Sequence, residues 1–335
     1  MGYAHHALRG SSLNSLVKIF TILVTICKIS LLARLLLPSD FGLFSLVAIS
    51  LGIIEATTET GINTIILQSK KSVSYFLDTA WVIAILRGLI ISILMIVLGF
   101  AMQMFYHEQK LFFLVSVASL VPFIKGFINP SIIILRKEFR FFKDSLYQFS
   151  LIVVDAAAAI LAALIFHSVF AFIGGMLTAA IFEVIVSFLC FTQRPTFLFI
   201  PTRAKEIFHN ARGLNISAAL TYAMQNVDNL IIGKVVGVAP LGIYANAYSL
   251  SHRLSLEFAK SVQYGVFPIY VKILDERSRL QRAFWKSTVT TLGFVTLISL
   301  PFFLFPTQII SVFLGAKWLD AVPILRPLLI AGILQ

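Results

Sequence analysis

The sequence predicts an all-α membrane protein of many spans, arranged as two parallel-repeat helical lobes around a central cavity. Of its 335 residues 59% are hydrophobic and 13% are charged, and the mean hydropathy is +0.93. A soluble core of this length cannot bury so much apolar surface. Its apolar stretches reach the ~20 residues that a helix needs to cross a bilayer core of ~30 Å. Shifted by 200 residues, residues 29–48 also lie over residues 229–248, and a duplicated set of membrane helices is typical of proteins whose halves rock against each other.

The apolar stretches predict ten spans, in the order 13–37, 41–67, 78–104, 111–135, 146–166, 169–192, 211–236, 241–269, 284–305 and 321–335. Each is expected to be a helix, because lipid offers no partner for an unpaired backbone group. The first span is expected to be retained, since Lys18 and Lys28 interrupt its apolar run and no small-residue cleavage site is evident. Cys27 and Cys190 lie inside predicted helices without metal-ligand or disulfide spacing, and we expect them to be buried thiols.

The longest polar connection, at 193–210, is predicted to be a cytoplasmic linker between an N-terminal six-helix lobe at 1–192 and a C-terminal lobe at 211–335. An even number of helices per lobe gives both lobes the same orientation, related by an axis along the membrane normal. The second lobe has room for about four helices. We therefore expect a C-terminally truncated form, with little transport from residues 1–335 alone.

The repeated block carries matched residues at the junction of two predicted spans. Arg34 falls on Lys234 and Gly42 falls on Gly242, and this glycine is the only identity in the block. Apolar residues also meet apolar residues where Leu31, Leu32, Leu35 and Leu36 fall on Ile231, Ile232, Val235 and Val236. Both copies therefore occupy the same place in the series of spans.

The loop charges predict a cytoplasmic N-terminus. With that orientation the inner loops carry Arg9, Lys70, Lys71, Arg136, Lys137, Arg140, Lys143, Arg194, Arg203, Lys205, Lys272, Arg277, Arg279 and Arg282. The outer loops carry only Arg34, Lys110, Lys234 and Lys317. Such an asymmetry is what the positive-inside rule requires. Topology thus explains the net charge of +12, and no nucleic-acid partner is expected.

The run RKEFRFFK at 136–143 combines bases with aromatic residues. It is typical of an interfacial element whose arginines and lysines meet the phosphates of membrane lipids. Ordinary topology signalling explains it equally well.

Polar residues recur on one face of the first span and at matching positions of the seventh. In the first span they stand three and four residues apart, at Ser11, Asn14, Lys18, Thr21, Thr25 and Lys28. In the seventh, Thr221, Gln225 and Asp228 stand 200 residues after Thr21, Thr25 and Lys28. We interpret both faces as lining a central cavity. The alternative is hydrogen bonding between packed helices, worth less than ~2 kcal/mol per contact.

Further ionisable residues lie inside predicted spans, where they are costly and usually face an interior cavity. Glu55 and Glu59 stand one turn apart, so they either carry a coupling ion or pair with a nearby base. Arg87 and Lys125 are single bases in apolar helices. Each either faces the cavity, or extends its charged end to the membrane surface, or forms a structural ion pair. Arg253 begins a polar stripe on the eighth span and is a further cavity candidate, unless pairing along its own helix accounts for it.

Chemistry by a metal or a nucleotide is not indicated. The six histidines are scattered, and HExxH, CxxC and GxxxxGK[ST] motifs are absent from the sequence. We expect no metal site, no cofactor and no nucleotide hydrolysis. Asp155 and Glu183, one in each of the fifth and sixth spans, receive no role.

Five blocks carry a family resemblance: LLARLLLPSDFGLFSLV at 31–47, ETGINTIILQ at 59–68, VDNLIIGKVVGVAPLGIYANAYSL at 227–250, VFPIY at 266–270 and GAKWLDAVPILRPL at 315–328. In this order they resemble Wzx-type polysaccharide flippases of the multidrug/oligosaccharidyl-lipid/polysaccharide exporter superfamily. The resemblance implies twelve or more helices in two lobes around a V-shaped cavity. It also implies movement of a polyprenyl-pyrophosphate-linked oligosaccharide across the bacterial inner membrane, for lipopolysaccharide or exopolysaccharide biosynthesis, with polysaccharide polymerase or export proteins as partners.

An anionic pyrophosphate and a hydroxyl-rich glycan need a polar passage through low dielectric, and bases slightly exceed acids in the predicted spans. Lys28 and Asp228 hold equivalent positions near the outer ends of their spans. We hypothesise that they approach each other when the outer mouth is closed, and that its opening frees Lys28 to attract pyrophosphate. The alternative is that the match of positions is accidental.

Two other functions stay open. A related antiporter for small cationic drugs would favour acidic and aromatic cavity residues, which the basic excess disfavours. A membrane-embedded glycan polymerase or ligase would usually place its reactive residues on a sizeable outer loop, and the predicted outer loops are short. We therefore expect a transporter and not an enzyme.

Overall fold

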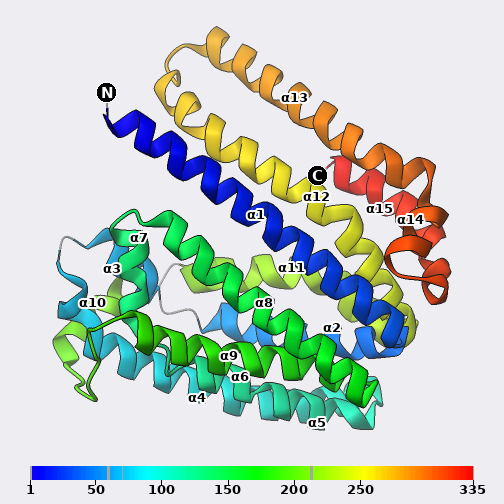
Figure 1. Ribbon diagram of the computed structural model, residues 1–335, viewed down its shortest axis with the longest axis horizontal. Coiled ribbons are helices and arrows are strands. Elements are labelled where there is room, and N and C mark those ends of the chain that lie inside the picture. Colours follow the sequence, from blue (N-terminus) through cyan, green and yellow to red (C-terminus); the bar gives the residue numbers. More distant parts are fainter. Residues whose placement is uncertain (1, 59–60, 70, 212–213, 335) are drawn as a thin grey trace. The chain divides into compact units, whose positions relative to one another are not determined.

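Figure 1 shows the computed structural model of the chain, which consists of helices and connecting loops. It describes the backbone of residues 2–58, 61–69, 71–211 and 214–334. Within these ranges the side chains at 2–15, 64, 208–211, 214–216, 252–261, 263–265, 268 and 334 are outside the described set. The described part of the chain has no strand, which confirms the predicted all-α class.

Among the described residues, six helices are long and apolar enough to cross a membrane. These are Leu16–Leu35 of α1 (Gly2–Leu35), α2 (Pro38–Thr57), α4 (Val73–Tyr106), α8 (Phe141–Phe166), α9 (Phe170–Cys190) and α13 (Arg277–Leu304). The predicted spans at 211–236, 241–269 and 321–335 fall on α11 (Leu214–Val235), α12 (Val238–Lys272) and α15 (Val322–Leu334). Their described residues do not reach the same length and hydropathy. The chain is a multi-pass membrane protein.

The predicted span at 41–67 is interrupted in the structure. α2 ends at Thr57, and α3 (Ile62–Gln68) begins after Gly61. Gly61 has a φ of 62°, in the left-handed region where a residue without a Cβ is favoured. A continuous helix was the wrong prediction here, because apolar length alone does not register a change of backbone conformation.

The predicted span at 111–135 is also broken. It consists of α5 (Gln109–Ala118), α6 (Leu120–Lys125), the 3-10 helix η1 (Pro130–Ile133) and α7 (Ile134–Lys137). The chain bends by 71° between α5–α6 and η1–α7, so the two parts together form a broken span or a re-entrant loop. Pro130 has no N–H to continue the preceding helix, and Asn129 Oδ1 accepts from the backbone N–H of Ser131 at 3.0 Å to start the next one.

Backbone contacts divide the chain into two compact units. The first contains residues 1–36 and 43–237, and the second contains residues 37–42 and 238–335. The predicted division into lobes at 1–192 and 211–335 stays a prediction.

α11 makes its contacts in the first unit. Tyr106 Oη at the end of α4 donates to the carbonyl oxygen of Leu230 at 3.1 Å. The Tyr222 ring lies on Gly52 of α2, where an added Cβ would stand 2.1 Å from the ring. These two contacts attach α11 to α4 and α2.

Close helix packing forms the core of the first unit. Figure 1 shows α8 between α1 and α9. Gly175 of α9 lies so near α8 that an added Cβ would be 2.8 Å from the Ala159 Cβ. The rings of Phe44 and Phe172 stack with centroids 4.3 Å apart. Small residues at such contacts let membrane helices approach closely, where dispersion and not the hydrophobic effect holds them together.

The second unit is built around α12, which packs against α13 and α15. The chain between them forms α14 (Pro306–Phe313) and the 3-10 helix η2 (Ala316–Ala321). Trp318 of η2 is fully buried, and its ring meets the edge of Phe41 at 4.8 Å between centroids. The short segment 37–42 thus completes the core of this unit.

The matched glycines of the repeat face each other inside the second unit. A Cβ on Gly42 would lie 1.8 Å from the carbonyl oxygen of Val238, and a Cβ on Gly242 would lie 1.9 Å from that of Pro38. Residues 38 and 42 become 238 and 242 under the 200-residue shift, so the two contacts exchange places. A two-fold relation between the two turns produces such a reciprocal pair of contacts. The helix boundaries follow the same shift, with junctions at 35–38 and 235–238.

The predicted linker contains a helix, α10 (Pro201–Ala211), that packs on the first unit. Ala204 and Ile207 are buried in one cluster with apolar residues of α3 and α4. Lys71 Nζ forms an ion pair with Glu206 at 2.8 Å, and this hydrogen bond raises the pKa of Lys71 above its ordinary value. The half of the linker that follows Pro201 is therefore part of the packed structure.

Candidate functional site

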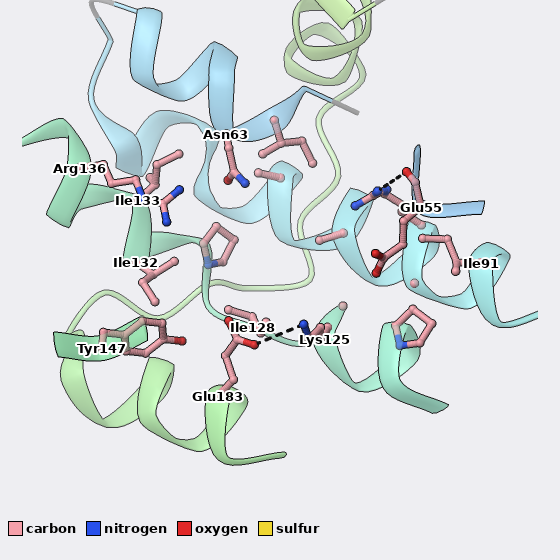
Figure 2. Close-up of a pocket in the computed structure, with 18 of the residues that line it drawn as sticks. Glu55, Asn63, Ile91, Lys125, Ile128, Ile132, Ile133, Arg136, Tyr147 and Glu183 are labelled. Atoms are coloured by element: carbon pink, nitrogen blue, oxygen red, sulfur yellow. Dashed lines mark hydrogen bonds and ion pairs between the residues drawn. The ribbon is translucent and has the colours of Figure 1, made fainter. Parts of the chain in front are cut away.

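A polar cavity lies inside the first unit, among apolar helices. Its volume is about 310 Å³, and α2, α3, α4, α6, η1, α7, α8 and α9 contribute to its wall. Figure 2 shows its labelled polar side chains converging from opposite walls. Ionisable residues inside a membrane bundle usually mark a functional site, so this cavity is the candidate site.

The charged lining contains equal numbers of acids and bases. The residues are Glu55, Asp144, Glu183, Arg87, Lys125 and Arg136. Glu55, Arg87 and Lys125 were singled out in the sequence, and the structure brings them to one cavity. Their roles as coupling-ion and substrate residues stay predictions.

Each of the three bases faces an acceptor in the protein. Arg87 donates through Nε to the carbonyl oxygen of Thr58 at 2.8 Å and through Nη2 to that of Glu55 at 3.0 Å. These carbonyls belong to the last turn of α2 and the residue that follows it, so Arg87 satisfies groups that the broken helix leaves unpaired. Arg136 Nε donates to Asp144 Oδ2 at 2.9 Å.

Lys125 faces Glu183 at a longer distance. Its Nζ lies 3.9 Å from Glu183 Oε2, beyond the length of a hydrogen bond. The two residues come from α6 and α9, which pack against each other, and they lie next to each other on the cavity wall (Figure 2). The gap between them is wide enough for the oxygen of a ligand to interact with both.

Three uncharged polar residues complete the lining: Asn63, Tyr147 and Gln148. Tyr147 is 7% exposed, and its hydroxyl has no hydrogen-bond partner among the described residues. Figure 2 shows this hydroxyl directed toward Glu183. The amides and the hydroxyl can both donate and accept hydrogen bonds.

Lys28 lies outside the cavity lining and forms an ion pair with Asp155. Lys28 Nζ of α1 stands 2.6 Å from Asp155 Oδ2 of α8, and both side chains are mostly buried, with 14% and 23% exposed. The sequence paired Lys28 with Asp228 instead. Asp228 Oδ1 accepts from the backbone N–H of Asn229 at 2.8 Å. The predicted gate between Lys28 and Asp228 stays a hypothesis, and any such gate must compete with Asp155.

The other described residues of the predicted polar stripes have local contacts or exposed positions, and the side chains of Ser11 and Asn14 lie outside the described set. Thr21 Oγ1 donates to the carbonyl oxygen of Val17 at 2.9 Å, and Thr25 Oγ1 donates to that of Thr21 at 2.8 Å. Both hydroxyls therefore bond within their own helix. Lys18, Thr221 and Gln225 are exposed.

Two candidates fall outside the described residues: Glu59 and the side chain of Arg253. Both stay predictions. The two cysteines require a correction, because Cys27 and Cys190 are exposed in the structure and not buried. Location inside an apolar span does not tell which face of the helix a residue occupies, or whether that face is covered.

The basic run at 136–143 has contacts of its own. Lys137 Nζ donates to the carbonyl oxygens of Ile66, Ser69 and Lys71 at 2.9, 3.0 and 2.6 Å. Arg140 pairs with Glu138 at 2.8 Å, and Arg136 pairs with Asp144. Three of its four bases thus have partners in the protein, which leaves less of the run for lipid phosphates.

The sequence reading assigned no role to the two carboxylates that matter most here. Asp155 and Glu183 are each the only acid in the apolar part of their helix. A lone carboxylate in such a helix requires a base from a neighbouring helix. That requirement, applied to Lys28 and Lys125, was the available signal. Nothing in the sequence pointed to Tyr147.

Comparison with known proteins finds a family and a fold. The family described as "Polysaccharide biosynthesis protein" matches residues 31–323. The chain is 24% identical over 284 residues to the teichuronic acid biosynthesis protein TuaB of Bacillus subtilis. That alignment covers 83% of this chain and 58% of TuaB. It is 19% identical over 339 residues to the lipopolysaccharide biosynthesis protein WzxC of Escherichia coli. That alignment covers 100% of this chain and 68% of WzxC. The chain thus spans between about three fifths and two thirds of the length of these relatives.

A solved structure shares the fold. It is the inward-facing conformation of a multidrug resistance MATE family transporter of the MOP superfamily, with a TM-score of 0.65 and 16% identity over 94% of this chain and 78% of that one. At this identity the likeness shows the fold alone. Together with the family match, it confirms the resemblance that the five sequence blocks carry.

Proposed function

Since this chain belongs to the polysaccharide biosynthesis protein family, we propose that it is a flippase for polyprenyl-pyrophosphate-linked oligosaccharide units. It moves them from the inner to the outer leaflet of the bacterial inner membrane by alternating access, for the synthesis of cell-surface polysaccharide. It has a cytoplasmic N-terminus and acts as a transporter and not as an enzyme. Its partners are the lipid-linked glycan, the surrounding membrane lipids, and polymerase or export proteins.

The observation that carries the proposal is a polar cavity inside an otherwise apolar helix bundle, in a chain of this family. A bare pyrophosphate or a sugar hydroxyl costs several kcal/mol to move into hydrocarbon. A polar passage inside the bundle lowers that cost, while the polyprenyl tail stays in lipid. The same bundle without buried polar groups would have no means to move such a head group.

We assign the substrate path to the basic and polar residues singled out in the sequence. Lys18, Lys28 and Arg253 attract the pyrophosphate. The glycan contacts are assigned to Arg87, Lys125, Thr21, Thr25, Thr221 and Gln225, and Lys28 and Asp228 form the gate. Glu55 and Glu59 are the candidates for a coupling ion. In support of these roles, Glu55, Arg87 and Lys125 share one cavity.

A second candidate function is antiport of small cationic drugs, because the solved structure of similar fold is a multidrug transporter. The lining of the cavity does not decide between the two functions, since its three acids and three bases cancel. The family does favour the flippase, because both relatives named above are polysaccharide biosynthesis proteins.

The test is export of surface polysaccharide by a strain that lacks its own flippase. The gene for this protein, expressed at its full length, is expected to restore export and leave resistance to cationic dyes unchanged. Dye resistance without restored export would assign the protein to drug antiport and overturn the flippase proposal.

A further inference from the structure

The Tyr147 hydroxyl in the cavity faces the Glu183 carboxylate but makes no hydrogen bond of 3.5 Å or less with a described group. Tyr147 is 7% exposed, its Oη has no hydrogen-bond partner among the described protein groups, and it points into the cavity (Figure 2). Burial of a hydroxyl without a hydrogen bond costs about 1–3 kcal/mol, and most buried polar groups are satisfied. A buried, unsatisfied hydroxyl on a cavity wall marks a place where an atom of a ligand completes the bond.

The charges of the cavity disfavour a charged ligand. Its three acids and three bases give a formal charge of zero. Arg87 and Arg136 are already held by acceptors of the protein. A pyrophosphate beside Tyr147 would be repelled by the Glu183 carboxylate. A metal cation there would be repelled by the Lys125 ammonium, which lies 3.9 Å from that carboxylate. A neutral ligand meets neither repulsion.

The hydrogen-bonding groups around Tyr147 suit a ligand that carries hydroxyls. Glu183 accepts, Lys125 donates, and the Tyr147 hydroxyl and the Gln148 amide do both. A sugar hydroxyl also donates and accepts, so it can satisfy several of them at once. The volume of about 310 Å³ lies at the lower end of small-molecule pockets, which run from roughly 300 to 1,000 Å³.

The cavity also has an extended form and a definite position. Its lining on α4 runs from Ala80 to Ile91, about 16 Å along the helix at 1.5 Å per residue. At one end it reaches Arg136 and Asp144, in and beside the run at 136–143 that the loop charges place on the cytoplasmic side. That end of the cavity therefore lies toward the side on which the proposed flippase loads lipid-linked glycans.

We propose that this cavity is a docking subsite for a neutral sugar of the lipid-linked glycan. Tyr147 donates a hydrogen bond to a sugar hydroxyl, and Lys125 and Glu183 bind other hydroxyls of the same ring. The pyrophosphate is bound elsewhere, by bases that this cavity does not contain. The assignment rests on the proposed flippase function.

The test is thermal unfolding of the purified protein with and without an equimolar, millimolar mixture of glucose, galactose, mannose, N-acetylglucosamine and N-acetylgalactosamine. Parallel samples contain inorganic pyrophosphate or sodium chloride. The sugars are expected to raise the unfolding temperature, because a ligand that binds only the folded state stabilises it. Tyr147→Phe is expected to weaken the apparent sugar affinity about fivefold, the effect of one lost hydrogen bond.

The same variant separates a ligand role from a structural one. Because the Tyr147 hydroxyl has only a long contact with Glu183 and no hydrogen bond of 3.5 Å or less, Tyr147→Phe without sugar is expected to change the unfolding temperature little. The matched control is Tyr106→Phe, which loses a hydrogen bond to Leu230 outside the cavity. That control is expected to unfold at a lower temperature and to keep the full response to sugar.

Three results would overturn the subsite: no shift with the sugars, an unchanged sugar affinity in Tyr147→Phe, or a Tyr147-dependent shift with pyrophosphate or sodium in place of sugar. Export in the flippase-deficient strain is measured separately. Normal export together with any of these results removes the subsite and leaves the proposed function. Tyr147-dependent sugar binding without export removes the flippase and leaves a sugar site.

Discussion

Two lysines of the basic run at 136–143 differ in what they contact. Lys137 donates to three backbone carbonyls, at the end of α3 and in the turn after it, where the helix leaves carbonyl groups unpaired. Lys143 is exposed and makes no hydrogen bond or ion pair with the described residues. One lysine therefore supports the fold, and the other is available to lipid.

We expect Lys137→Ala to destabilise the protein by about 1–2 kcal/mol, because three backbone carbonyls, two of them in part-buried bonds, lose a charged donor. Lys143→Ala is the matched control, with an expected change within about 0.5 kcal/mol. Thermal unfolding in one detergent measures both. Equal effects of the two substitutions would show that the bonds of Lys137 carry no special weight.

The ion pair of Lys28 leads to a prediction that also tests the gate hypothesis. Lys28→Ala and Asp155→Ala each leave one charge unpaired in a mostly buried position, and we expect each to cost about 1–3 kcal/mol. The exchange of the two charges should recover part of the loss. Asp228→Ala should change stability less than Asp155→Ala, and should reduce export if the gate exists.

Thermal unfolding and export assays of the same variants separate these outcomes. If Lys28→Ala and Asp228→Ala both leave export unchanged, the gate is excluded, and so is Lys28 as a substrate contact. If Asp155→Ala leaves the unfolding temperature unchanged, the pair adds nothing to stability.

At the scale of single residues, the sequence predicted which positions are polar inside the bundle but not their partners. Arg87 and Lys125 were identified because a base inside an apolar helix is costly. Their actual partners, the α2 carbonyls and Glu183, depend on how helices distant in sequence rotate against one another. Periodicity along one helix holds no information on that rotation.

Among the elements, the reciprocal glycine contact between the α1–α2 turn and the start of α12 allows a direct test. We expect Gly42→Ala to destabilise the protein by about 1–3 kcal/mol, because its Cβ would overlap backbone atoms of Val238. Gly293→Ala on α13 is the control, since nothing lies within 4 Å of its Cβ. The control should raise stability by up to about 1 kcal/mol, the difference in helix propensity.

Thermal unfolding of the two variants gives the comparison. An increase of stability in both would mean that the backbone at Gly42 moves aside without cost, and that the contact is loose.

The positions of the helices were largely predictable from sequence, and their breaks were not. Long apolar runs such as 146–166 and 169–192 correspond to α8 and α9 within a few residues. The breaks after Thr57 and before Pro130 depend on backbone conformation at single residues. Pro130 is visible in the sequence, but its effect was outweighed by the apolar residues around it.

For the whole molecule, the distribution of charged loops predicts the orientation in the membrane. In a background with Cys27→Ser and Cys190→Ser, we expect Arg140→Cys to react with a membrane-impermeant maleimide only after the cytoplasmic face is opened. Ser168→Cys should react in intact spheroplasts. Labelling of position 140 from outside would reverse the topology and remove the argument for a parallel repeat.

The mutual contact of Gly42 and Gly242 determines what a single substitution does to the contact between the two copies of the repeat. In a dimer of identical subunits, one substitution at this glycine would alter both sides of the contact at once. In a single chain that holds both copies, a substitution alters one side only. All but one of the aligned positions in the repeated block differ, and the shared one is where each copy touches the backbone of the other. Within this block the two copies therefore differ everywhere except at the glycine through which they touch.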